Sequence, residues 1–133
     1  MITMVAGKES RKQLRVNADP SAPIRVDIMG QGFLDVLNAR DISIGGLGIR
    51  VSHDFEGCDI NSAVELIVTL GRTKPFKTTG VIRHHSKTAG DHVFGIQFTS
   101  LSAEQYQAVE AYIQACARRR ARSELGAALA ARG

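Results

Sequence analysis

The sequence predicts an all-β domain, an antiparallel barrel, that is followed by one helix. Three observations lead to this prediction: strand-like alternation recurs along the chain, short turn signals separate the alternating stretches, and the periodicity becomes helical near the C-terminus. The 133 residues fit one domain that is long enough to bury a hydrophobic core. No crossover helices are predicted between the strands, so neighbouring strands are expected to be antiparallel, and closing the sheet removes its exposed edges.

Apolar and polar residues alternate with a period of two in four stretches of the chain. Successive side chains of a strand point to opposite faces, so this pattern is typical of strands with one buried face. The apolar positions are Ile24, Val26 and Ile28, then Leu47, Ile49 and Val51, then Val64, Leu66, Val68 and Leu70, and finally Phe94, Ile96 and Phe98. Turn signals separate these stretches at residues 19–21, 30–32, 71–73 and 89–91.

The periodicity then changes to that of a helix. Ser102 followed by Gln105 predicts a capping box at the helix start. The residues expected on its apolar face are Tyr106, Val109, Ile113 and Cys116, with Tyr112 beside them. We expect this face to pack on the barrel and to cover an otherwise open end.

A basic, alanine-rich tail follows this helix. It begins with the cluster Arg118–Arg122 and runs to Gly133. Alanine and arginine favour helix, so the tail could extend the preceding helix, but it has too few large apolar residues for a second domain. The expected organisation is a flexible arm over residues 1–7, the domain over 8–118 and the tail over 119–133. The arginine cluster is expected to be a solvated helix end, with contact to an acidic partner as the alternative.

Composition excludes several classes of protein. The net charge of +4 is mild and basic residues do not interleave with aromatic ones, so nucleic-acid binding is not indicated. No apolar run has the length of a membrane span, and the first residues do not form a signal peptide. Cys58 and Cys116 lack metal-ligand spacing, and two lone thiols fit the reducing cytoplasm better than a disulfide framework.

Two arginines, Arg11 and Arg15, lie four residues apart near the N-terminus. A guanidinium presents a planar fork of donors that matches guanine O6 and N7, matches phosphate oxygens and stacks on a purine. Taken alone, this pair could be a solvated basic arm.

A short loop further along the chain carries a carboxylate, a hydroxyl and two glycines, at Asp41, Ser43, Gly45 and Gly46. Serine can donate to phosphate, and glycine lets a ligand approach the backbone amides closely. Asp41 repels phosphate, so it fits a site only where it faces donors, either the guanine N1–H and N2 amine or an arginine. Alone, the loop could be a hairpin turn. Together with the arginine pair, it predicts a site for a small molecule that carries both guanine and phosphate.

These motifs and their order resemble the signature of PilZ domains, which are bacterial receptors for the second messenger cyclic di-GMP. The pattern Arg-x-x-x-Arg stands at Arg11 and Arg15, and Asp-x-Ser-x-x-Gly runs from Asp41 to Gly46. Residues 80–83 resemble the family's glycine-x-valine stretch, and residues 95–98 resemble its closing strand. The resemblance covers roughly residues 8–118 and implies a six-stranded antiparallel barrel with a C-terminal α-helix.

The resemblance also implies a role for each motif residue. Arg11 and Arg15 would clamp the ligand through stacking, guanine-edge hydrogen bonds and phosphate contacts. Asp41 would read the guanine donor edge or steady an arginine, and Ser43 would hold phosphate. Gly46, with Gly45 beside it, would let the ligand lie against the strand end.

Three further positions bear on the same site. Arg83 stands where many members carry a tryptophan that covers a base, and an arginine can also stack. Lys12 adds positive charge nearby. Ser10 precedes Arg11 where some members have another arginine, which leaves open whether one ligand or a stacked pair binds.

The predicted function is a non-catalytic cytoplasmic receptor that binds cyclic di-GMP and relays it to a protein partner through ordering of the N-terminal arginine segment. The alternative is a PilZ-fold interaction module that acts without the ligand. An enzyme is not indicated, because Asp41 and Ser43 have no matching histidine in a recognisable pattern. No cofactor or metal site is predicted: adjacent strand residues such as His84 and His85 point to opposite faces, and His53 and His92 are isolated in sequence.

Overall fold

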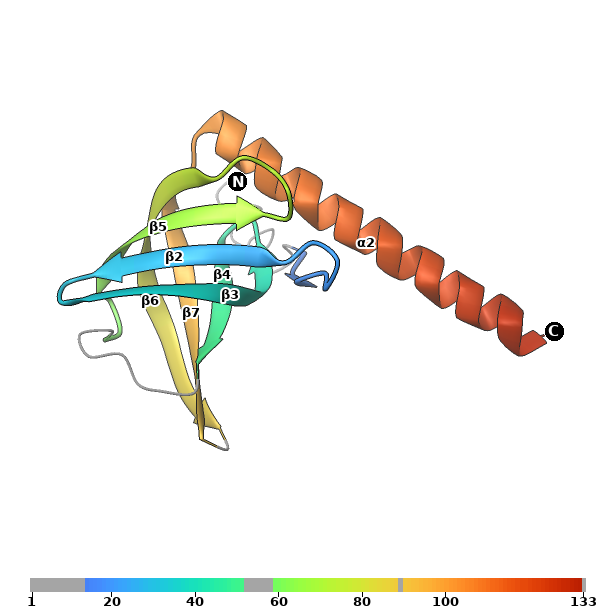
Figure 1. Cartoon of the computed structure of the whole chain (residues 1–133), viewed down its shortest axis with the longest axis horizontal. Coiled ribbons are helices and arrows are strands. Elements are labelled where there is room, and N and C mark those ends of the chain that lie inside the picture. Colours follow the sequence, from blue (N-terminus) through green and yellow to red (C-terminus); the bar gives the residue numbers. More distant parts are fainter. Residues whose placement is uncertain (1–13, 52–58, 89, 133) are drawn as a thin grey trace, which may run out of the picture.

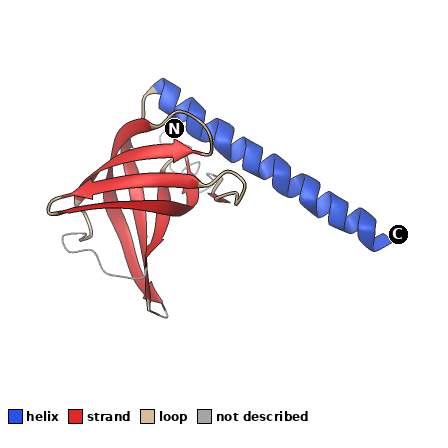
Figure 2. Ribbon diagram, viewed as in Figure 1, coloured by secondary structure: helices blue, strands red, loops and turns tan. Residues whose placement is uncertain are grey.

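The computed structural model describes residues 14–51, 59–88 and 90–132. Arg11 and Lys12, two of the predicted site residues, lie outside these ranges. The elements in chain order are β1 (Val16–Asn17), β2 (Ile24–Gly30), β3 (Phe33–Ser43), β4 (Gly46–Val51), β5 (Ala63–Leu70), β6 (Phe76–Thr88), β7 (Asp91–Ser100) and α2 (Ala103–Arg132). Figure 1 shows the strands wrapped into a barrel with α2 against one side of it, and Figure 2 separates the strands from the helix by colour.

Six antiparallel strands close the barrel in the order β3-β2-β5-β6-β7-β4, because β4 pairs again with β3. The predicted six-stranded antiparallel barrel with a C-terminal helix is therefore confirmed. β3 makes this closure possible through its length of 11 residues. Its first half pairs with β2 and its second half with β4, with a register shift between Ala39 and Asp41. The two-residue strand β1, which the sequence patterns do not predict, adds to β3 at Ile42 and Asp41.

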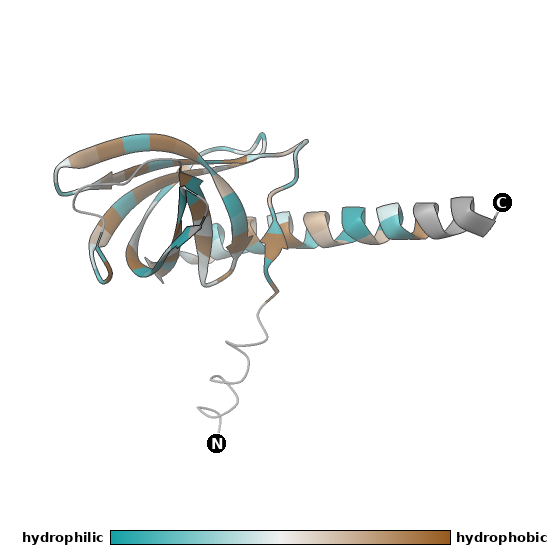
Figure 3. Cartoon of the chain, turned by 90° about the horizontal axis from the view of Figure 1, so that it is seen from below, coloured by the Kyte–Doolittle hydropathy of each residue, from teal (hydrophilic) through white to brown (hydrophobic). Residues whose placement is uncertain are grey.

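The barrel interior is filled by the residues that the alternation pattern marks as apolar. The predicted inward positions of β2, β4, β5 and β7 are all buried, and Phe94 is the largest of the fully buried side chains. Figure 3 shows hydrophobic and hydrophilic residues alternating along the strands. This alternation places the opposite set of side chains on the outer surface, where a ligand can reach them.

Helix α2 extends the same core. Val109 and Ile113 are buried in the barrel's hydrophobic cluster, with Tyr112 at its edge and Cys116 packed against it. Tyr106 departs from the predicted buried face, because 42% of this residue is exposed. Residues 118–126 are exposed, so the second half of the helix continues past the barrel surface. No helix in the described part of the chain has the length and apolar character needed to cross a bilayer.

The predicted capping box is present at the start of α2. The Ser102 amide donates to Gln105 Oε1 and the Gln105 amide donates to Ser102 Oγ, each at a distance of 3.1 Å. Gln105 Nε2 also donates to the Lys77 carbonyl oxygen at 2.7 Å, which ties the cap to β6. We expect Ser102→Ala to lower the free energy of unfolding by about 1 kcal/mol, because a helix amide loses its acceptor. Urea denaturation checks this value, and an unchanged midpoint would contradict it.

Candidate functional site

Arg15 and the Asp41–Ser43 segment meet at the second half of β3. Arg15 Nη1 lies 2.5 Å from Asp41 Oδ1, and Arg15 Nη2 donates to Ser43 Oγ at 3.3 Å. Pairing of β1 with β3 creates this contact, because Val16 and Asn17 align with Ile42 and Asp41. The structure thus brings together residues that are 26 positions apart in the sequence.

A second arginine, which the sequence motifs did not single out, completes the ion pairs of Asp41. Arg40 Nε donates to Asp41 Oδ2 at 3.0 Å, so each carboxylate oxygen has an arginine partner. Only 5% of Asp41 is exposed, whereas the side chains of Arg15 and Arg40 are about half exposed. A buried carboxylate with two charge-assisted hydrogen bonds holds both guanidinium groups at the surface in defined positions.

The turn between β3 and β4 is fixed by its own hydrogen bonds. The Gly45 amide donates to Ser43 Oγ at 3.2 Å, and the Gly45 carbonyl oxygen accepts from the Phe98 amide at 2.9 Å. Ser43 and Gly46 face each other as the last pair of this hairpin. The Ser43 hydroxyl is therefore held between Arg15 and the turn backbone.

Two glycines on β4 are required by packing. A Cβ atom at Gly46 would overlap the carbonyl oxygen of Ile96 in β7. A Cβ atom at Gly48 would lie 2.6 Å from Asp41 Oδ1, so this glycine leaves room for the carboxylate. Gly48 was not among the predicted site residues; its signal in the sequence is only that it repeats glycine two residues after Gly46, on the same face of the strand.

Arg83 lies on β6, two strands away from β4. Its Nε donates to Gln97 Oε1 at 2.8 Å and its Nη1 donates to Asn61 Oδ1 at 2.7 Å. Gln97 on β7 is the register partner of Gly46, so the barrel links Arg83 to the glycine turn through one intervening side chain. Among the residues that the structure describes, the hydrogen bonds of Arg83 lead to Gln97 and Asn61 and not to the Arg15–Asp41 group.

The histidines pair with each other and with an aromatic ring. His85 Nε2 lies 3.0 Å from His92 Nδ1, and the His85 ring stacks on Phe94 at a centroid distance of 4.3 Å. His84 lies beside Gly95 of β7. Within residues 14–51, 59–88 and 90–132, no three metal-ligating side chains converge.

Comparison with solved structures gives several likenesses in fold. The inhibitor of motility MotI/DgrA of Bacillus subtilis matches with a TM-score of 0.66 and 20% identity, covering 84% of this chain and 51% of that one. The K. pneumonia MrkH–c-di-GMP complex matches with a TM-score of 0.70 and 13% identity, covering 85% and 55%. The PilZ domain of YcgR from Escherichia coli with c-di-GMP matches with a TM-score of 0.68 and 14% identity, covering 87% and 97%.

The chain spans about half the length of the first two of these proteins, so it corresponds to one part of each. No curated protein matches the sequence. The family model of the PilZ domain matches residues 9–115, which include the arginine pair, the hairpin turn and the first half of α2. The sequence match and the barrel agree, and the chain belongs to the PilZ domain family, a family of non-catalytic receptors for cyclic di-GMP.

Proposed function

We propose that this chain binds cyclic di-GMP at the β3–β4 hairpin. The observation that carries the proposal is the convergence of Arg15, Asp41 and Ser43, with Arg15 held 2.5 Å from the carboxylate. Gly45 and Gly46 form the adjoining turn. Arg11 and Lys12 are proposed to complete the site from the preceding residues.

The pairing of Asp41 favours one of its two expected roles. Because Arg15 and Arg40 already occupy both of its oxygens, the carboxylate is better placed to steady arginines than to read the guanine edge. Arg15 remains about half exposed while it is anchored, so its guanidinium face and remaining donors can meet a base or a phosphate. Arg40 adds a second cation at the same edge, a contribution that the motif alone does not suggest.

Ser43 and Arg83 would contact different parts of the ligand. The Ser43 hydroxyl accepts from Arg15 and from the Gly45 amide, which leaves its own proton for a phosphate oxygen. Arg83 is held at two of its nitrogens by Gln97 and Asn61, which would keep its plane in a fixed orientation for stacking on a base.

The proposed output is a relay to a protein partner. Closing of Arg11 and Arg15 over the dianionic ligand would order this segment against the barrel and change the surface that a partner meets. The ligand can shift this equilibrium only by its difference in affinity for the two states. The alternative is an interaction module that uses the same fold without the ligand.

Calorimetric titration of cyclic di-GMP into the wild type and into Arg15→Ala tests the proposal, with GTP as the control ligand. We expect saturable binding by the wild type, none for GTP, and at least about tenfold weaker binding by Arg15→Ala, because hydrogen bonds to charged groups contribute ~1.5–3 kcal/mol. The stoichiometry distinguishes one bound molecule from a stacked pair.

Arg25→Ala is the matched control variant. Arg25 forms a surface ion pair with Asp27 at 3.0 Å on β2, so its loss removes one positive charge from the barrel without touching the hairpin. Its affinity should equal that of the wild type. Absence of binding by the wild type would contradict the proposal and leave the interaction module as the function.

A further inference from the structure

The segment that follows Arg15 connects the proposed ligand site to helix α2. We call residues 15–22 the strap. Its first part is β1, and the Ala18 amide then donates to the Arg40 carbonyl oxygen at 2.9 Å. The strap ends in a tight turn in which the Ala22 amide donates to the Asp19 carbonyl oxygen at 2.9 Å. Hydrogen bonds therefore fix it to β3 at one end, beside the ligand site, and close its turn at the other.

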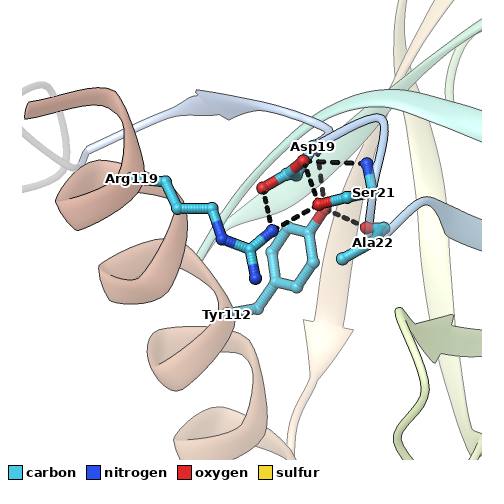
Figure 4. A network of polar contacts seen from close by, with 5 residues as sticks. All are labelled: Asp19, Ser21, Ala22, Tyr112 and Arg119. Atoms are coloured by element: carbon cyan, nitrogen blue, oxygen red, sulfur yellow. Dashed lines mark hydrogen bonds and ion pairs between the residues drawn. The ribbon is translucent and has the colours of Figure 1, made fainter. Parts of the chain in front are cut away.

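Tyr112 of α2 holds both sides of this turn. Its hydroxyl accepts from the Asp19 amide at 3.0 Å and donates to the Ala22 carbonyl oxygen at 2.6 Å (Figure 4). Only 9% of Tyr112 is exposed. Burial raises the pKa of its hydroxyl to about 12, so at neutral pH the proton needed for the bond to Ala22 is present.

Arg119 holds the same turn from two helical turns further along α2. Its Nη1 lies 2.5 Å from Asp19 Oδ2 and also donates to Ser21 Oγ. The Ser21 hydroxyl and amide donate to Asp19 Oδ1 at 2.7 and 2.9 Å. These bonds from Ser21, together with Arg119, lower the pKa of Asp19 from its ordinary value, which favours the charged carboxylate that Arg119 contacts.

The strap has space beside it. A cavity of about 530 Å³ lies between residues 16–20 and the helix, where Cys116, Arg120 and Ser123 form part of its wall. The hydrogen bonds between helix and strap are concentrated at Tyr112 and Arg119. Val16, Ala18 and Ala22 of the strap pack against the hydrophobic core, so a change in the strap reaches α2 through this packing and through these bonds.

We infer that Tyr112 and Arg119 are positioning residues for ligand binding: they hold the strap so that Arg15 is presented at the β3–β4 hairpin. The inference rests on the proposed function of the hairpin. Because coupling between two sites is reciprocal, a ligand that draws Arg15 toward itself must also act on the helix through the same bonds. Arg119 lies where α2 leaves the barrel, so the exposed residues 118–126 are the part of the helix that would change when the ligand binds.

Hydrogen exchange with and without cyclic di-GMP tests the inference in the wild type, Tyr112→Phe and Arg119→Ala. Tyr112→Phe removes only the hydroxyl. Arg118→Ala is the matched control, because Arg118 is the neighbouring exposed arginine, and the helix–strap hydrogen bonds of the described residues come from Tyr112 and Arg119. Without ligand, we expect faster exchange at residues 16–22 in Tyr112→Phe and Arg119→Ala, and wild-type exchange in Arg118→Ala.

With ligand, we expect the wild type to change its exchange at residues 112–123. Arg119→Ala and Tyr112→Phe should lose this response and bind about fivefold or more weakly, in the lower range of measured site-to-site coupling. Ligand binding by the wild type without a response of the helix, or wild-type affinity in both variants, would overturn the inference and leave the proposed function intact.

The two proposals fail in different ways. If the wild type does not bind cyclic di-GMP, the proposed function fails, and with it the coupling to the ligand. Unchanged exchange of the strap in unliganded Tyr112→Phe and Arg119→Ala would show instead that these residues do not hold the strap, whatever the ligand does.

Discussion

Asp41→Ala is expected to weaken the binding of cyclic di-GMP by about a hundredfold or more. One buried carboxylate holds both Arg15 and Arg40, through contacts of 2.5 and 3.0 Å. Across an interface, truncating one partner of a buried, hydrogen-bonded charge pair typically costs ~2–5 kcal/mol. We expect a loss of ligand affinity of the same order when the residue that anchors the ligand-binding arginines is removed. Here the loss affects two cations at once, since both guanidinium groups lose their ion pair with Asp41. The effect should therefore exceed that of removing Arg15 alone.

Calorimetry at fixed salt measures this change, and thermal unfolding of each variant shows whether the barrel is retained. Asp27→Ala is the matched control, because Asp27 also pairs with an arginine but lies on β2. Asp41→Asn keeps the shape of the side chain and removes its charge, which separates packing from electrostatics. Wild-type affinity in a folded Asp41→Ala protein would show that the ligand does not depend on the anchored arginines.

The strands with the clearest alternation could be predicted from the sequence, and β3 shows why others could not. Leu34 and Val36 are apolar but point outward, with exposures of 67% and 51%, so the segment lacks a clean period of two. β1 has only two residues and exists through its pairing with β3. Such a strand is defined by a partner distant in sequence, which local periodicity does not encode.

The candidate site was only partly predictable, because some of its contacts also depend on strand pairing between distant parts of the sequence. The resemblance placed Arg15, Asp41 and Ser43 in one site, and the structure brings them into contact. Arg40 was missed because a register shift between Ala39 and Asp41 decides which side chains of β3 share a face. A bulge of this kind interrupts the alternation from which facing residues are read in the sequence.

The links between the strap and α2 are the least predictable part of the molecule. Arg119 and Asp19 are 100 positions apart, and each alone has the appearance of a solvent-exposed charge. Their contact depends on where the helix axis crosses the barrel, which is set by the packing of Val109 and Ile113 in the core. No pattern in the sequence indicates where the helix axis crosses the barrel, so the contact between Arg119 and Asp19 could be identified only in the folded chain.

Gly46→Ala is expected to destabilise the barrel and the ligand site together. The added Cβ would collide with the Ile96 carbonyl oxygen, which belongs to the backbone of β7 and cannot rotate away as a side chain would. Inserting one carbon into a tightly packed site typically costs about 1–3 kcal/mol, occasionally more. The strain is steric, because Gly46 is not among the glycines with positive φ. Relief requires β4 to move away from β7, which displaces the turn that holds Ser43.

Gly126→Ala makes the same chemical change at a position where we expect the stability of the protein to rise and not to fall. Nothing lies within 4 Å of a Cβ at this position on α2, so the variant should gain up to about 1 kcal/mol of helix stability, the usual difference between glycine and alanine. Urea denaturation and titration of both variants measure stability and affinity separately. A Gly46→Ala protein with the wild-type midpoint would show that β4 and β7 can separate at little cost. If such a protein also bound ligand more weakly, Gly46 would act by admitting the ligand and not by closing the barrel.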